Sequence, residues 1–322
     1  MEYRNTLSQP SDHLPLPSDK SPVASSALED IERTYELRKR EPNLIFVSDN
    51  LIGAHENGEG RIIEGNNGVD LTFHAVVAEF NNRIDPRRAI GPIDDVSAEV
   101  TFGFFDGREP LKFPRGVWIR EGSKADFGIN DTHRLVVASI EGLLERQVYA
   151  LNGSYSGHGP KRIGLPEGLV KVTVALTAEL RNKVLRRSEF MLETRRDTDI
   201  LIDTRLIELW RWKYDQLLEF VDQGVKLAKR YELAGASVSH TIALECEAGE
   251  TIEEVESAGD HWAARVSQFL ATYLGEPYRL RFIMAVSASG PSSDLSFVSY
   301  LVKGNQIFLE FAREVRQSVN NS

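Results

Sequence analysis

The spacing of apolar residues along the chain changes near Thr198, and this change predicts two kinds of structure. Before it, apolar side chains alternate with polar or small ones, as at Val96, Ala98, Val100, Phe102 and Phe104. After it, they recur three or four positions apart, as at Ile207, Trp210, Tyr214, Leu217, Val221, Gly224 and Ala228. A period of two places apolar residues on one face of a strand, and three-four spacing places them along one side of a helix. We therefore predict a β domain over residues 42–196 and a mainly helical domain over residues 200–318.

The first 41 residues differ from both parts. Residues 1–26 are rich in serine, proline and aspartate and show no periodicity, so we expect a disordered tail. Residues 27–41 follow, where Ser26 is a candidate N-cap and Leu28, Ile31 and Tyr35 share one helical face. This pattern predicts a short helix.

Turn-forming clusters such as Glu-Asn-Gly and Asn-Asn-Gly divide the β part into short strands. The predicted strands are Leu44–Ser48, Gly60–Glu64, Leu71–Phe80, Val96–Phe105, Gly116–Glu121, Ala125–Ile129, Arg134–Ile140, Gln147–Leu151, Leu169–Leu180 and Val184–Thr194. Strands at this spacing without helices between them are typical of a sandwich or barrel. With Trp118 and Tyr149 as core aromatics, we predict an immunoglobulin-like antiparallel β-sandwich without the disulfide.

The helical part contains three amphipathic stretches, over Asp203–Leu233, Thr251–Leu274 and Leu295–Ser318. Asp203 is the expected cap of the first, and Gly275 and Pro277 are expected to end the second. The third has two apolar stripes, one through Leu301 and Phe308 and one through Tyr300 and Phe311. A helix that is apolar on two faces is either central in its domain or needs a partner.

Two further segments alternate like strands: Val238 to Cys246, and Leu280 to Val286. With the helix between them they would form a right-handed βαβ unit, which would make this part α+β. The alternative is a helical bundle in which these segments are extended linkers. The pattern by itself leaves both open.

Charge and cysteine content limit the partners and the cellular compartment that we expect for the protein. The net charge of −10 disfavours nucleic acid, whose phosphates require clustered lysine and arginine. A single cysteine, Cys246, allows no intrachain disulfide, which fits a reducing cytoplasm. We find no stretch that resembles a signal peptide or is apolar for long enough to span a bilayer.

Two segments are candidate binding sites. The loop Gly153–Arg162 combines glycines with the polar residues Ser154, Ser156, His158, Lys161 and Arg162, which can cradle an anion. However, a strand and not a helix is expected after it, so a long loop between strands is the simpler interpretation. The second segment surrounds a predicted hairpin tip and holds Arg181, Lys183, Arg186 and Arg187. These cations would bind phosphates, or they protect an exposed sheet edge.

The chain has no convincing catalytic, cofactor or metal motif. Asp126-Phe127-Gly128 matches a kinase triplet by chance, because the other kinase motifs are missing. On one strand, His240 and Cys246 would lie about 20 Å apart, too far for a catalytic pair. His261 is another candidate partner of Cys246, although a buried thiol and a structural histidine explain both residues. We therefore expect no cofactor and no bound metal.

Taken together, these patterns favour a soluble, non-enzymatic interaction or scaffold protein. The helical domain is expected to bind a protein partner or a second copy of the chain, with Phe297, Tyr300 and Phe311 as candidate contact residues. Two alternatives stay open: an enzyme with dispersed active-site residues between the domains, and an anion- or nucleic-acid-sensing module. A pocket between the domains with converging ionisable groups would support the enzyme.

Overall fold

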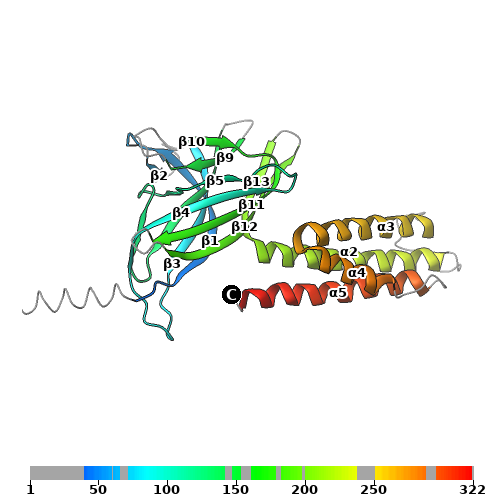
Figure 1. Cartoon of the computed structure of the whole chain (residues 1–322). Coiled ribbons are helices and arrows are strands. Elements are labelled where there is room, and N and C mark those ends of the chain that lie inside the picture. Colours follow the sequence, from blue (N-terminus) through cyan, green and yellow to red (C-terminus); the bar gives the residue numbers. More distant parts are fainter. Residues whose placement is uncertain are drawn as a thin grey trace, which may run out of the picture.

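A computed structural model describes residues 40–59, 61–65, 72–141, 147–153, 161–178, 183–197, 200–237, 251–287 and 295–320. In these residues the chain is a mixed α and β protein with antiparallel sheets and four helices. The sheets lie at one end, and the helices extend away from them side by side (Figure 1). Residues 1–39 lie outside the described part, as do the tail and the short helix predicted there.

The first sheet has the strand order β10-β9-β8-β3-β1-β2, and β6 also pairs with β8. Its strands are β1 (Leu44–Glu56), β2 (Ile62–Glu64), β3 (Phe73–Asn82), β6 (Val117–Trp118), β8 (Thr132–Glu141), β9 (Gln147–Asn152) and β10 (Lys161–Gly164). A register shift between Phe46 and Ser48 interrupts the pairing of β1 with β3. Bulges of this kind bend a strand and increase its twist.

The second sheet has the order β13-β12-β11-β4-β5, and β7 also pairs with β4. Its strands are β4 (Ile93–Phe104), β5 (Leu111–Phe113), β7 (Ala125–Phe127), β11 (Gly168–Ala178), β12 (Lys183–Asp197) and β13 (Ile200–Glu208). On β11 the buried residues alternate with half-buried ones, as the sequence pattern predicts. The strand therefore turns one face to the core between the sheets and the other away from it.

Apolar side chains from both sheets meet in one hydrophobic core. Trp118 lies at its centre, fully buried, and makes edge-to-face contacts with Phe80 and Phe127. Phe46 of the first sheet contacts Phe190 of the second at a centroid distance of 4.8 Å. These aromatic contacts hold the two sheets against each other.

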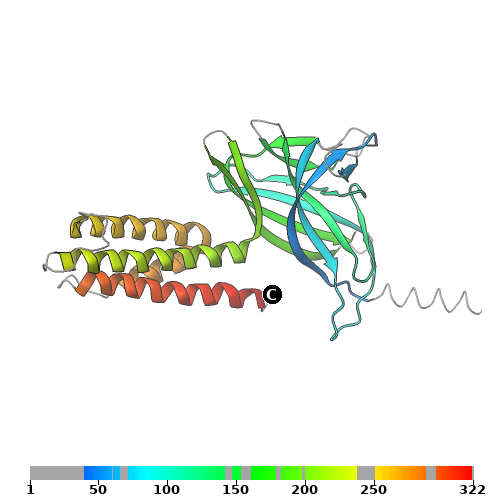
Figure 2. The ribbon, with the colours of Figure 1, turned by 180° about the vertical axis from the view of Figure 1, so that it is seen from behind.

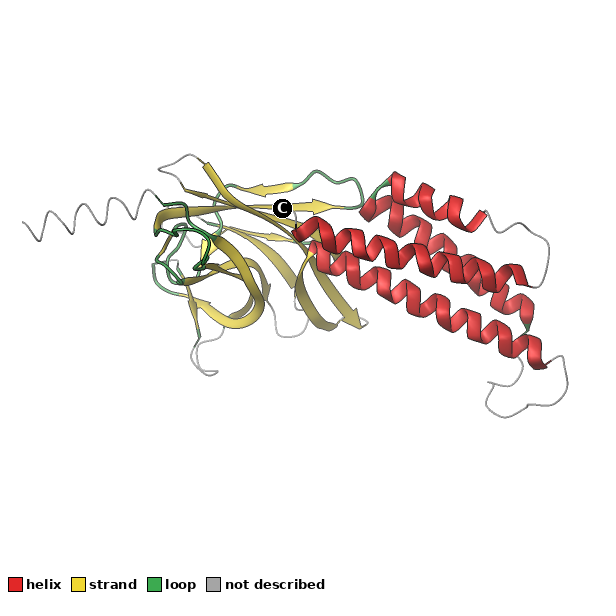
Figure 3. Ribbon diagram, turned by 90° about the horizontal axis from the view of Figure 1, so that it is seen from below, coloured by secondary structure: helices red, strands yellow, loops and turns green. Residues whose placement is uncertain are grey.

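The helices are α2 (Leu209–Ser237), α3 (Ile252–Phe269), α4 (Glu276–Ser287) and α5 (Leu295–Asn320), with a π-helical turn at Leu270–Leu274. Thr251 caps α3 in a capping box with Glu254. Gly275 ends the π-helical turn with a φ of 101°, which favours glycine. The four helices form a bundle, and α5 returns along α2 so that its C-terminal end lies beside the sheets (Figures 1 and 3).

Each of the ten strands predicted in the β part overlaps an observed strand. The first predicted helix, however, begins too early. Residues 200–208 form β13 and pair with β12, and the helix starts at Leu209 and not after Asp203. The apolar residues at 200–202 and 206–207 fit either structure locally, and the pairing with the long neighbouring strand β12 decides the outcome.

The predicted strand at Leu280–Val286 is wrong, because this segment lies within α4. Phe282 and Val286 are four residues apart and are the buried residues of this helix, whereas Leu280 and Met284 are exposed. A spacing of four fits both periods, and Pro277 in the first turn favours a helix start. A βαβ unit with this segment as its second strand is therefore excluded, and the segment around His240 and Cys246 lies outside the described residues.

Both apolar stripes of α5 face other helices of the bundle. Leu301, Phe308 and Phe311 are fully buried, and Phe308 contacts Phe220, Trp262 and Phe282 from three different helices. This agrees with the interpretation of α5 as a central helix. The double stripe is thus explained within one chain.

Candidate ligand-binding site at the junction

The junction between sheets and helices begins where β13 continues directly into α2. Glu208 ends the strand and Leu209 begins the helix, so no loop separates them. Leu209 and Trp212 are buried in the same cluster as Met191 of β12. The first turn of α2 is therefore packed against the second sheet.

The π-helical turn provides a second contact. Tyr273 packs edge-on against Phe105, which follows β4, at 4.8 Å and against Trp212 at 4.9 Å. Burial raises the pKa of the Tyr273 hydroxyl above its usual value of 10.0. An extra residue in a helix shifts the side chains that follow it, and here Tyr273 reaches the sheet.

A pocket of about 360 Å³ opens beside this junction. It is lined by Arg186, Arg187, Ser188 and Glu189 of β12, Glu208 of β13, Leu209, Trp210 and Lys213 of α2, Leu274, Tyr278 of α4, and Glu314, Val315 and Ser318 of α5. Its walls therefore come from two strands, three helices and the π-helical turn. This volume is in the range of small-molecule sites.

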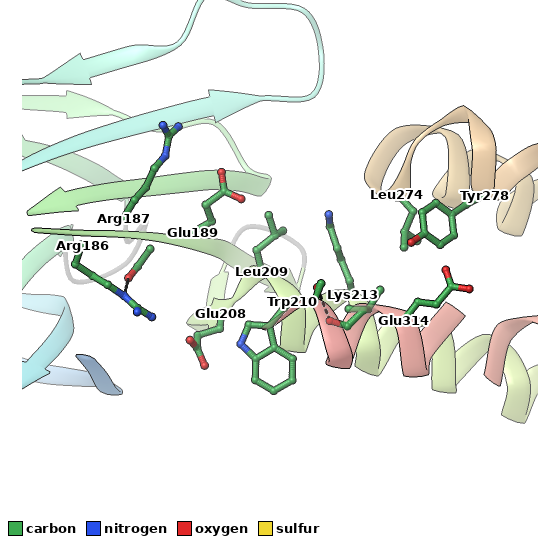
Figure 4. A pocket seen from close by; sticks show the side chains of 13 residues that line it. Arg186, Arg187, Glu189, Glu208, Leu209, Trp210, Lys213, Leu274, Tyr278 and Glu314 are labelled. Atoms are coloured by element: carbon green, nitrogen blue, oxygen red, sulfur yellow. Dashed lines mark hydrogen bonds between the residues drawn. The ribbon is translucent and has the colours of Figure 1, made fainter. Parts of the chain in front are cut away.

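Lys213 stands between the sheet wall and the wall formed by α4 and α5 (Figure 4). It is half-buried, and its neighbour Lys171 already pairs with Glu189, with Nζ and Oε1 2.8 Å apart. Burial lowers the pKa of Lys213, the charge of Lys171 lowers it further, and Glu189 partly opposes them. Among the described residues, no carboxylate lies within ion-pair distance of Lys213.

Arg187 and Glu189 extend from the same side of β12, and the side chain of Lys213 points to that side as well (Figure 4). Arg186 extends from the opposite side of the strand. Arg187 likewise has no ion-pair partner in the described part of the chain. Arg186 directs its Nε to the Ser188 hydroxyl at 3.4 Å. Arg187 of β12 and Lys213 of α2 are therefore two cations of the pocket that have no ion-pair partner among the described residues.

The acid on the opposite wall is already neutralised. Arg281 donates two hydrogen bonds to Glu314, at 2.9 and 2.8 Å, and these bonds lower the pKa of Glu314. Burial raises the pKa of Tyr278, and the charge of Glu314 raises it further. Tyr278 thus stays protonated at neutral pH, and its hydroxyl donates a hydrogen bond to Glu314.

Trp210 adds a further donor without an acceptor. Its Nε1 is buried and has no hydrogen-bond partner among the described residues. A buried indole N–H normally finds an acceptor, so its absence is unfavourable. Lys213, Arg187 and Trp210 can donate but not accept, and in the described part of the chain these donors have no acidic or hydrogen-bonding partner.

The positive charge of the pocket residues can be explained in part by the helix dipole of α5, without any ligand. Val315 and Ser318 belong to the last turns of α5, and cations near the C-terminal end of a helix are favourable to its dipole. That interaction is weaker than a hydrogen-bonded ion pair and does not require the burial of an ammonium group. It therefore accounts for the arginines better than for Lys213.

A second hollow of about 380 Å³ lies near Tyr273, lined by Phe104, Phe105, Asp106, Arg108, Pro166, Glu167, Leu169 and Tyr273. Its charged groups already have partners. Arg108 pairs with Asp106, and Glu167 also interacts within the chain. We therefore place the candidate site in the pocket around Lys213.

Only some of the polar and cationic residues predicted from sequence as binding residues line the pocket. Arg186 and Arg187 line the pocket, whereas Lys183 pairs with Glu41 at the surface. Arg162 lies between Glu56 and Glu141, and Lys161 is exposed at the start of β10. Four predicted residues, Ser154, Ser156, His158 and Arg181, lie outside the described residues.

The three aromatic residues predicted on the third helix pack against other helices of the bundle, with Phe311 buried and Phe297 and Tyr300 half-buried. Phe297 packs against Tyr231, and Tyr300 lies near Trp262. Phe311 is fully buried, with the Arg281 guanidinium 4.7 Å from its ring centroid. Their contacts are thus with neighbouring helices.

Sequence reasoning missed Lys213, although a signal was present. Lys213 is in helical register with the buried residues Leu217, Phe220 and Leu227 of α2. A lysine on the apolar face of a helix is a candidate functional residue, because burying an ammonium group is unfavourable. The long apolar neighbours Trp212 and Tyr214 obscured this position.

The described residues contain no cluster that could bind a metal ion and no helix that could cross a membrane. His261 is exposed on α3, 2.7 Å from the Ser257 carbonyl oxygen, and does not line the pocket. Comparisons of the chain with known protein families, with curated proteins and with solved structures found no match, so the site is interpreted from its own residues.

Proposed function

We propose that the protein is a binding module that takes a small carboxylate or phosphate compound in the junction pocket. The observation that carries this proposal is the half-buried Lys213, which has no ion-pair partner among the described residues. A bound anion would supply the missing opposite charge. A charge-assisted hydrogen bond of this kind is about twice as strong as a neutral one.

The local charge balance supports an anion rather than a cation. Lys171, Lys213 and Arg187 share one nearby carboxylate on the sheet wall, Glu189, while Glu314 across the pocket is held by Arg281. Arg186 and Glu208 also line the pocket, but both extend from the opposite side of the sheet, and their charges are of opposite sign (Figure 4). The ligand would therefore meet excess positive charge in spite of the net charge of −10 of the whole chain.

This proposal develops the anion-sensing alternative drawn from the sequence. A scaffold or partner-binding role also stays a proposal, and the two stripes of α5 do not support it because other helices cover them. An immunoglobulin-like sandwich stays our description of the sheets, on the basis of the shared core around Trp118. Because the pocket has walls from sheet and bundle, a ligand would fix one against the other.

Binding can be tested by isothermal titration calorimetry with inorganic phosphate, succinate and citrate. We expect at least one of them to bind wild-type protein and to raise its melting temperature by mass action. K213M keeps the aliphatic stem but removes the charge, and it should abolish binding. K226M is the matched control, because Lys226 is an exposed lysine of the same helix.

Affinity should also fall at alkaline pH. An anion requires protonated Lys213, and the lowered pKa of Lys213 means that its charge is lost at a lower pH than that of an ordinary lysine. Binding that is unchanged in K213M, or equal for neutral glycerol and citrate, would contradict the proposal. If none of the three anions binds, the pocket is not an oxyanion site of this class.

The enzyme alternative is favoured by one observation, the lowered pKa of the same lysine, since a less protonated amine is a better nucleophile. It predicts that Lys213 reacts with an aldehyde to form an imine that borohydride reduces. Mass spectrometry after treatment with glyoxylate and borohydride would locate the label. Labelling of Lys213 no faster than of Lys226 would exclude this alternative.

A further inference from the structure

Two neighbouring helices of the bundle expose aliphatic side chains on the same outer face. On α2 these are Leu218 and Val225, which are 37% and 40% exposed. On α5 they are Val302 and Leu309, at 45% and 39%. The members of each pair are seven residues apart, so each pair lies along one side of its helix.

The two pairs lie at matching levels. The antiparallel register of α2 and α5 is given by the contacts Phe220–Phe308 at 6.3 Å and Tyr231–Phe297 at 4.7 Å. In this register Leu218 is level with Leu309, and Val225 is level with Val302. Figure 2 shows α2 and α5 side by side, and no described element lies over these two helices on this side. We call this surface the α2–α5 face.

On α2 the exposed pair belongs to a longer heptad pattern. Residues spaced three and four apart follow one seam: Arg211, Tyr214, Leu218, Val221, Val225, Ala228 and Glu232. The five central residues are apolar, and the two ends carry opposite charges. Such a repeat is typical of a helix that packs against another helix along a coiled-coil seam.

Two pairs of residues in this seam are related by a point between Val221 and Asp222. Leu218 and Val225 lie at equal distances from that point, and so do Arg211 and Glu232. The midpoint of Val302 and Leu309 on α5 is at the same level. In the described part of the chain neither Arg211 nor Glu232 has an ion-pair partner. In an isologous contact residue i of one copy meets residue j of the other and j meets i, so these two pairs make the seam self-complementary.

We propose that two copies of the chain associate through the α2–α5 face, with their α2 helices antiparallel. The two-fold axis passes near Val221, so that Leu218 of each copy meets Val225 of the other. Arg211 of each copy then faces Glu232 of the other, which gives two complementary ion pairs. This proposal does not depend on the function of the junction pocket.

The size of the face fits a modest dimer. Its length from Arg211 to Glu232 is about 32 Å at 1.5 Å per residue, and two helices are about 20 Å wide. It would bury about 600 Å² per copy, or about 1,200 Å² in total, which is the lower end of specific interfaces. We therefore expect a reversible dimer that dissociates on dilution.

Sedimentation equilibrium of the full chain over a dilution series tests the dimer. The wild-type chain should shift from dimer to monomer, and the double variant L218Q/V225Q should stay monomeric throughout. The matched control is L280Q/M284Q, which removes two exposed apolar residues from α4 and should leave the dimer unchanged. A wild-type chain that is monomeric at every concentration would overturn the proposal.

The antiparallel orientation is tested by charge reversal. R211E and E232R should each weaken the dimer about tenfold or more, because like charges then face each other across the two-fold axis. The double variant R211E/E232R restores both pairs and should dimerise like wild type. Single variants without effect, or a double variant weaker than both, would refute the antiparallel arrangement, and circular dichroism verifies that each variant is folded.

Discussion

Replacing Gly259 with alanine tests how closely α3 and α5 must approach each other. An added Cβ at this position would lie 2.5 Å from Cζ and 2.6 Å from Cε2 of Phe297. Carbon atoms in contact normally lie about 3.5–4.0 Å apart, so the ring must move by about 1 Å. That movement also disturbs the packing of Phe297 on Tyr231, whose centroids are 4.7 Å apart.

Two opposing free energies decide the result. Glycine inside a helix is less favourable than alanine by about 1 kcal/mol, so the substitution gains that amount. Overpacking typically costs about 1–3 kcal/mol. We therefore expect G259A to lower the free energy of unfolding of the bundle by about 1 kcal/mol.

Two other helical glycines serve as controls. At Gly224 the added atom meets only the amide end of the Asn305 side chain, which can rotate away. At Gly304 it would lie 3.0 Å from Cη2 of Trp262, so a shift of a few tenths of an ångström suffices. We expect G224A to stabilise the bundle by about 0.5 kcal/mol, and G304A to be nearly neutral.

The measurement is urea unfolding, followed by far-ultraviolet circular dichroism and tryptophan fluorescence. Truncating the ring should remove the penalty, so G259A in an F297A background should be stabilising. If G259A is as stable as G224A, or if the penalty persists without the ring, the packing argument is refuted.

Three further predictions concern charge and capping. Because burial lowers the pKa of Lys213, its charged form destabilises the fold, and stability should rise as pH increases toward the unfolded value of 10.5. K213M should thus raise stability at neutral pH by about 0.5 kcal/mol in thermal unfolding, and an equal loss would contradict this. Burial raises the pKa of Tyr273 above 10.0, so stability present below pH 10 is lost as pH rises through the raised pKa, and Y273F should reduce this alkaline loss in a pH series of melting temperatures. T251A should cost about 1 kcal/mol in urea unfolding, and T251S, which keeps the cap, should cost less.

Much of the secondary structure follows from local pattern. Turn chemistry and alternation located ten of the strands, and helical spacing located α3 and α5, with Gly275 and Pro277 after α3, because these signals act within a few residues. Where a segment satisfied two periods, local pattern failed. Leu280–Val286 has apolar residues at spacings of both two and four, and the helix start at Pro277 together with packing against the other helices selects the helix.

The candidate site was likewise predictable from sequence only in part. Charge clustering alone drew attention to Arg186 and Arg187, but it could not separate them from Lys183, which pairs with Glu41. Lys213 is 26 residues from Arg187 in sequence, and the pocket joins them only because β13 leads α2 back along β12. A site assembled from distant segments leaves no local motif.

The sequence by itself determined that strands precede helices, that most strands are half-buried, and that α5 is apolar on two sides. These properties depend on the period of side chains along a single segment. Only the tertiary structure decided that β13 extends the second sheet, that α5 is covered by its neighbours, and that an unpaired lysine faces a pocket. Each of these outcomes depends on contacts between segments far apart in the chain, whose free energies no local pattern contains.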